Sequence, residues 1–65
     1  MDPQDRLLTL PEVTEITRLA KPTLYRMMKA GTFPRQIHLA TQRVAWLRSE
    51  VLEWVAKQAS ARRVA

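Results

Sequence analysis

The chain has 65 residues, which is enough for one small domain but not for a catalytic domain beside a binding domain. It contains no cysteine and one histidine, His38, which excludes disulfide bonds, thiolate metal sites and a zinc site built from histidines. Eleven Lys and Arg against six Asp and Glu give a net charge of +5, which favours a polyanionic partner: nucleic acid first, an anionic membrane surface second.

Hydrophobic residues make up 46% of the chain, so a folded domain is expected rather than a disordered basic tail. The longest apolar runs, such as 44–47, are too short for a transmembrane span or the core of a signal peptide. We therefore expect a cytoplasmic protein without a membrane partner. Residues 1–6 are polar and lack periodicity, which predicts a flexible N-terminus before a folded domain over 7–60 and a basic, flexible C-terminus over 61–65.

The first predicted helix covers about residues 10–17, where apolar residues recur at helical spacing. Thr9 precedes it and Glu12 follows three residues later, which is the pattern of a capping box. Pro11 lies in the first turn, where its missing N–H costs nothing.

A brief connection, residues 18–20, leads to a second predicted helix that ends at Ala30 and Gly31. Pro22 lies near its start, and Leu24, Met27 and Met28 form one apolar stripe that is expected to face the core. Two short helices joined by about three residues have the spacing of a helix-turn-helix.

Residues 32–34 end the second helix, and a β-hairpin is predicted after them. Polar and apolar residues alternate over 36–39, residues 40–42 resemble a turn, and 43–46 are rich in strand formers. The turn lacks an Asn-Gly pair, which leaves the strand register open.

A third helix is predicted from Leu47 to about Ser60, with Trp46 and Trp54 as core residues that anchor the hairpin to it. Because an isolated hairpin is unstable, it must pack against the helices. The fold class is therefore mainly α, a small winged helix-turn-helix in the order helix, helix, hairpin, helix.

The second helix carries the strongest binding signal. Its predicted outward face holds Pro22, Arg26 and Lys29, and the helix contains no acidic residue. In a helix-turn-helix the N-terminal residues of this helix reach base edges in the major groove. Arg26 can then read guanine, Thr23 or Pro22 can pack on a thymine methyl group, and Tyr25 can donate its hydroxyl to a phosphate. The alternative is an ordinary solvated basic surface.

The hairpin adds Arg35, Gln42 and Arg43, of which Arg43 is expected at the tip or just inside the second strand. The alternative for Arg35 or Arg43 is a surface ion pair with Glu50 or Glu53. The predicted DNA-binding residues are Lys21, Pro22, Thr23, Tyr25, Arg26, Lys29, Arg35, Gln42 and Arg43.

No catalytic site is predicted. His38 lies on a polar position of the first hairpin strand, with no cysteine, second histidine or clustered carboxylates to make it a ligand or a general base. The Thr and Ser hydroxyls have no base beside them, and one glycine cannot form a phosphate-binding loop. We expect neither an enzyme nor a bound metal or cofactor.

Several segments together resemble one known family: Leu8-Thr9-Leu10-Pro11-Glu12-Val13, Pro22 to Gly31, Phe33-Pro34-Arg35, Val44-Ala45-Trp46, Ser49-Glu50-Val51 and Trp54. They are similar to the AlpA family of phage-derived transcriptional regulators, which is itself similar to the DNA-binding domains of MerR proteins and phage excisionases.

The resemblance covers roughly residues 7–55 and implies a winged helix-turn-helix. It places Tyr25 and Arg26 where such proteins contact the DNA backbone and bases, and Arg43 on the wing. Ala20 departs from the family's usual serine or threonine N-cap, and Pro22 replaces a more usual serine.

We therefore predict a sequence-specific DNA-binding transcriptional regulator, an activator of phage or prophage-related genes. A module of this size buries roughly 600–1,000 Å² on DNA, which limits the affinity of one copy. We therefore expect a monomer or weak homodimer on DNA, helped by cooperative binding at repeated sites or by a protein partner such as RNA polymerase or an integrase. One alternative is an excisionase-type factor that directs recombination. The other is a protein-interaction module that acts on RNA polymerase.

Overall fold

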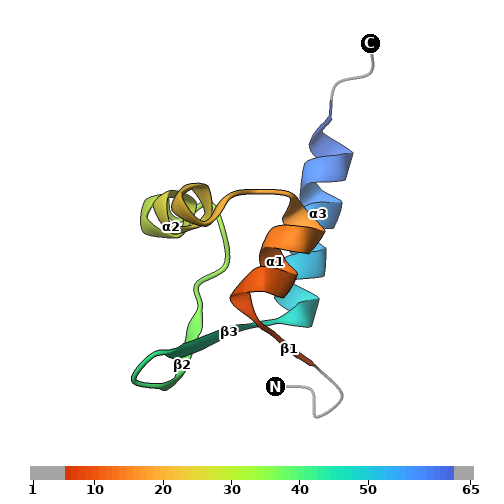
Figure 1. Ribbon diagram of the computed structural model, residues 1–65. Helices are drawn as coiled ribbons and strands as arrows, with labels where there is room; N and C mark the ends of the chain where they lie inside the picture. Colours follow the sequence, from red (N-terminus) through yellow and green to blue (C-terminus); the bar gives the residue numbers. More distant parts are fainter. Residues whose placement is uncertain (1–5, 63–65) are drawn as a thin grey trace.

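The computed structural model describes residues 6–62 (Figure 1), which form three helices and a three-stranded antiparallel sheet. The predicted order of helix, helix, hairpin and helix is confirmed, and one short strand precedes it. The elements are β1 (Leu7–Leu8), α1 (Leu10–Thr17), α2 (Lys21–Ala30), β2 (Ile37–Ala40), β3 (Arg43–Leu47) and α3 (Arg48–Ala61). The predicted flexible ends, 1–6 and 61–65, lie largely outside the described residues.

Helix α1 begins with the predicted capping box. The Glu12 N–H donates to the Thr9 hydroxyl at 3.4 Å, and the Thr9 N–H donates to the Glu12 carboxylate at 2.8 Å. At the other end Arg18 adopts a left-handed conformation, with φ of 61°, and its N–H donates to the Thr14 carbonyl at 2.8 Å. The chain therefore leaves α1 through a conformation that normally favours glycine.

Helix α2 starts without a side-chain cap, because Ala20 offers no acceptor, and Pro22 lies in its first turn. It ends at Gly31, which has φ of 79° and donates its N–H to the Met28 carbonyl at 3.1 Å. A Cβ at this position would meet no atom within 4 Å, so backbone conformation and not space requires the glycine.

The sheet order is β1-β3-β2, with β3 in the centre. Residues Thr41 and Gln42 form the turn between β2 and β3, and the register shifts between His38 and Ala40, which leaves Leu39 as an extra residue on β2. Strand β1 was not predicted; it adds to the far edge of β3 by pairing Leu8 with Trp46. Two residues are too few to show an alternating pattern in the sequence.

The core draws one fully buried side chain from each of α1, α2, β3 and α3, namely Val13, Leu24, Trp46 and Val51. Trp46 is buried as predicted, and its indole N–H donates to the Pro34 carbonyl at 3.0 Å. The half-buried Trp54 packs against this core.

The loop between α2 and β2 is fastened to α3. Trp54 on α3 donates its indole N–H to the Thr32 carbonyl at 2.7 Å. Its ring also meets the buried Phe33 edge-on, with the ring centres 4.9 Å apart. Trp54 thus anchors the loop that precedes the hairpin, and this anchoring fixes how α2 and β2 are placed relative to α3.

Figure 1 shows α1 and α3 on one side of the molecule, α2 on the other, and the β2–β3 hairpin running beneath both. The outer side of α2 is therefore free of other elements. Within residues 6–62 no helix combines the length and apolar character needed to cross a membrane.

Candidate nucleic-acid interface

Helix α2 buries the apolar stripe that the sequence predicts. Leu24 is fully buried, Met28 is 7% exposed, and Met27 packs partly buried against the same core. Arg26 and Lys29 are exposed on the opposite side. This division leaves a basic face of α2 in solvent, with the remaining predicted α2 residues Lys21, Pro22 and Tyr25 exposed and Thr23 half-buried.

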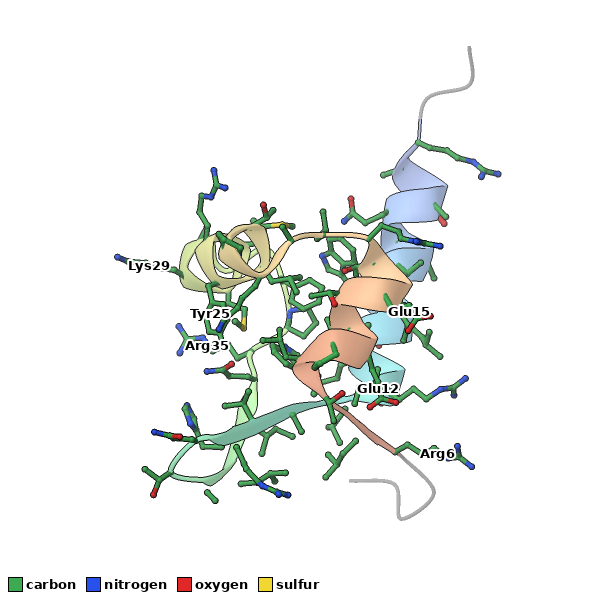
Figure 2. All side chains as sticks on the ribbon, viewed as in Figure 1. Arg6, Glu12, Glu15, Tyr25, Lys29 and Arg35 are labelled. Carbon is green, nitrogen blue, oxygen red and sulfur yellow. The ribbon has the colours of Figure 1, made fainter. Side chains whose placement is uncertain are left out.

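Positive charge is concentrated in one continuous part of the chain. Between Glu15 and Glu50 there is no acidic residue, and seven of the eleven cations fall there: Arg18, Lys21, Arg26, Lys29, Arg35, Arg43 and Arg48. This stretch encodes α2 and the hairpin. Figure 2 shows Tyr25, Lys29 and Arg35 together on the α2 side, away from Glu12 and Glu15 on α1. The fold therefore places these three side chains apart from the acidic residues of α1.

The hairpin residues are exposed where the sequence predicts them. Arg43 is the first residue of β3 and pairs with Ala40, and Gln42 lies in the turn. In the part of the chain that the structure describes, the ion pair is Lys57 with Glu53, at 3.7 Å. Neither Arg35 nor Arg43 forms the alternative ion pair with a glutamate of α3 among these residues. Both positive charges are therefore uncompensated there and can attract an external anion.

A hollow of about 650 Å³ runs between the N-terminal half of α2 and the hairpin. Lys21 and Tyr25 lie on its α2 wall and Gln42 and Arg43 on its hairpin wall, above apolar residues of β1 and the start of α1. The Lys21 ammonium lies 6.0 Å from the centre of the Tyr25 ring, which favours a fixed ring orientation. Four of the predicted residues are thus brought around one hollow that is lined by no acid.

The other predicted residues fall outside this hollow. Pro22 and Arg26 lie on the outward face of α2, and the half-buried Thr23 does not line it. Lys29 and Arg35 line a second, adjacent hollow together with Tyr25. The predicted set therefore forms one surface, composed of an outward helix face and two hollows beside it.

Two residues of this surface were missed by the sequence reasoning. His38 is exposed on β2 and lines both hollows, and Gln36 lines the smaller one. His38 was placed correctly on a polar strand position but was considered only as a metal ligand or a base. A signal was present in the sequence, since both residues lie within the acid-free stretch.

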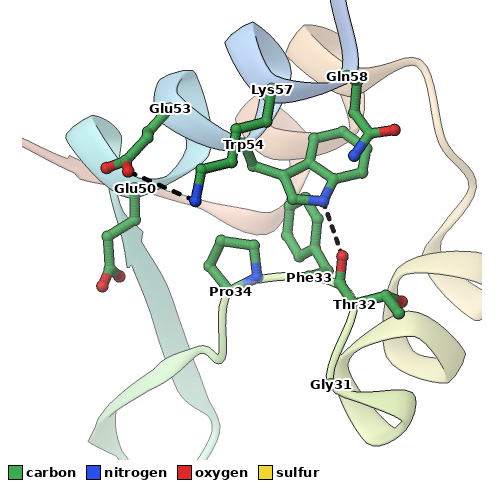
Figure 3. Close-up of a pocket in the computed structure, with 9 residues that line it drawn as sticks. All are labelled: Gly31, Thr32, Phe33, Pro34, Glu50, Glu53, Trp54, Lys57 and Gln58. Carbon is green, nitrogen blue, oxygen red and sulfur yellow. Dashed lines mark hydrogen bonds and ion pairs between the residues drawn. The ribbon is translucent and has the colours of Figure 1, made fainter. Parts of the chain in front are cut away.

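A third depression, of about 580 Å³, has different chemistry (Figure 3). It lies between the loop after α2 and helix α3, and Phe33, Pro34 and Trp54 form its apolar part. Glu50 and Glu53 border it beside Lys57. Because carboxylates repel phosphates, this depression does not extend the basic surface.

Within residues 6–62 no three His, Asp or Glu side chains come close enough to hold a metal ion. The pKa of Glu12 is lowered because its carboxylate accepts the Thr9 backbone N–H and hydrogen bonds with the Thr9 side chain. That carboxylate therefore serves the start of α1.

Comparison with known proteins gives a consistent match. Residues 6–59 match the family model described as Prophage CP4-57 regulatory protein (AlpA). The chain is 40% identical over 60 residues to a protein of Enterobacteria phage P4 described as uncharacterized protein ORF88, covering 92% of this chain and 68% of that protein. It is 30% identical over 59 residues to the DNA-binding transcriptional activator AlpA of Escherichia coli K12, covering 82% of this chain and 84% of that protein.

Proposed function

The chain belongs to the AlpA family of prophage regulatory proteins, and from this premise we propose that it binds duplex DNA and activates transcription of phage or prophage-related genes. The observation that carries the proposal is the exposed, acid-free face of α2 beside a basic hairpin. The E. coli relative is named a DNA-binding transcriptional activator, which supports both DNA binding and activation.

In this proposal the fold is a winged helix-turn-helix. Helices α1 and α2, joined by the three residues 18–20, form the helix-turn-helix, and the β2–β3 hairpin is the wing. Because the outer side of α2 is free, it can enter a major groove without rearrangement of the core. The hairpin then lies beside it, where Arg43 reaches an adjacent phosphate or a minor groove.

Residue roles follow from position. Arg26 lies on the outward face of α2, where a guanidinium can bind guanine O6 and N7 together. Pro22 and Thr23 are at the N-terminal end, near base edges and thymine methyl groups. Tyr25, Lys29, Arg35, Gln42 and Arg43 border the hollows and contact the sugar-phosphate backbone, and Lys21 acts with them at the start of α2.

The test is selection of bound duplexes from a random pool, followed by fluorescence anisotropy on the selected duplex over a range of salt concentrations. We expect Arg26→Glu to weaken binding by roughly 10-fold or more and to make the salt dependence shallower. Lys57→Glu, which makes the same charge change on α3, is the control and should bind nearly as the wild type does. Unchanged binding by Arg26→Glu would show that α2 does not read DNA.

Footprinting on natural DNA that contains the selected sequence separates activation from an excisionase-type role. A footprint over a single site upstream of a promoter, without bending of the DNA, supports regulation. A footprint over several phased repeats with bent DNA supports recombination control by several copies. Transcription in a purified system with RNA polymerase then tests whether the bound protein stimulates initiation.

A further inference from the structure

The smaller hollow, of about 360 Å³, lies between the hairpin-facing side of α2 and the start of β2. Tyr25 and Lys29 are four residues apart and therefore lie on the same side of α2. Arg35 and His38 line the hollow from the opposite wall. The buried Met28 of α2 also lines it. In Figure 2 Tyr25 and Arg35 lie beneath α2, and Lys29 extends outward from the same helix.

The residues that line the hollow have the charge and the hydrogen-bond donors that favour an anion. It comprises two cations, a phenol hydroxyl, an imidazole and an amide, with no carboxylate: Tyr25, Met28, Lys29, Arg35, Gln36 and His38. Arg35 forms no ion pair within residues 6–62, and neither does Lys29. The charges that face this hollow are therefore uncompensated by the described part of the chain.

Gln36 supplies an independent observation. Its side-chain oxygen is buried and has no hydrogen-bond partner among the described residues. A buried polar atom without a partner is unfavourable, and such atoms are rare in folded proteins. The same amide carries an NH₂ donor, and a half-turn of the terminal amide exchanges the positions of its oxygen and its NH₂ group.

We infer that this hollow binds one phosphate group of the DNA backbone, with Lys29 and Arg35 providing charge and Tyr25, Gln36 and His38 providing hydrogen-bond donors. The inference rests on the proposed function, because it assigns a phosphate site beside the helix that reads the bases. It adds His38 and Gln36 to the DNA-binding surface. Contacts from α2 and β2 to the same phosphate fix the hairpin relative to the groove.

The first experiment replaces the phosphates of the selected duplex, one at a time, by neutral methylphosphonates. In the wild type we expect a loss of affinity of roughly 10-fold at the phosphate that enters the hollow. The Arg35→Gln and His38→Thr variants should bind the unmodified duplex more weakly than the wild type does. In these variants, neutralising that one phosphate should cause little further loss of affinity. Lys57→Gln is the control and should retain the wild-type profile.

Gln36→Leu distinguishes a binding role from a structural one. Removal of a buried, unpartnered oxygen should leave the melting temperature unchanged or higher. Removal of a phosphate contact should lower duplex affinity by roughly 3- to 10-fold. A lower melting temperature with unchanged affinity would contradict the inference.

The outcomes separate this inference from the proposed function. If Arg26→Glu abolishes binding while the phosphate profile is the same in the wild type, Arg35→Gln and His38→Thr, the hollow is not a phosphate site and the proposed function stands. If Arg26→Glu has no effect, the proposed function fails first.

Titration of the ¹⁵N-labelled protein with inorganic phosphate adds a third arm. Shifts of the Gln36 side-chain amide with free phosphate, combined with a flat duplex profile, would assign the hollow to a free anion and overturn the backbone assignment.

Discussion

At the scale of single residues, the ends of α1 show how local chemistry positions α2. Thr9 and Glu12 satisfy backbone donors at the start, and Arg18 reverses the chain at the end. The capping box could be predicted because its residue types and spacing are diagnostic. The left-handed Arg18 could not, since arginine carries no preference for that conformation.

Glu12 makes stability depend on pH. Its pKa in the folded protein is lowered from 4.5, so its carboxylate stabilises the fold above that value and the contribution is lost as the pH falls through the lower, folded value. We expect Glu12→Gln to melt at a lower temperature than the wild type near neutral pH, with the difference shrinking in acid. Thermal unfolding followed by circular dichroism measures this. Glu15→Gln removes the same charge from the same helix and is the matched control.

Arg18 tests the conformation of the turn between α1 and α2. Arg18→Ala removes most of the side chain but keeps the Cβ atom, which is unfavourable in a left-handed backbone conformation. Arg18→Gly removes the Cβ atom as well. We expect the glycine variant to be more stable than the alanine variant by about 1 kcal/mol in urea denaturation. Equal stabilities would mean that the turn is not left-handed in solution.

At the scale of elements, the helices and the hairpin were predictable and β1 was not. The α2 boundaries follow from Pro22 and Gly31, and the buried face follows from the spacing of Leu24 and Met28. Strand β1 depends on a partner, β3, which lies more than thirty residues further along the chain. A pairing at that separation leaves no local pattern in two residues, so only the folded chain reveals it.

Strand β1 is expected to contribute to stability through one of its two side chains. Leu8 is 6% exposed and joins the core, whereas Leu7 is 46% exposed. Leu8→Ala should lower the free energy of unfolding by about 2–4 kcal/mol, and Leu7→Ala by less than about 1 kcal/mol. Chemical denaturation of the two variants provides the comparison. Similar small effects at both positions would show that β1 does not pack as described.

At the scale of the whole molecule, net charge by itself indicates only a polyanionic partner, and the fold determines where that partner binds. Within the acid-free stretch between Glu15 and Glu50, the residues of α2 and the hairpin form one surface because these elements border the same hollow. The α2 part of this surface was predicted from helical spacing. The hollows were not, because they arise from the placement of α2 beside the hairpin, which brings Tyr25 and His38 from separate elements to the same hollows.

In the proposed function, duplex DNA binds the surface formed by α2 and the hairpin and is not simply attracted by the total charge. The most direct test measures the affinity for the selected duplex in three variants that each lack one positive charge: Arg26→Gln on α2, Arg43→Gln on the hairpin and Lys57→Gln on α3. All three lower the net charge by the same amount. We predict that Arg26→Gln and Arg43→Gln each weaken binding by roughly 10-fold, while Lys57→Gln changes it by less than about twofold. Equal losses from all three variants would contradict the account.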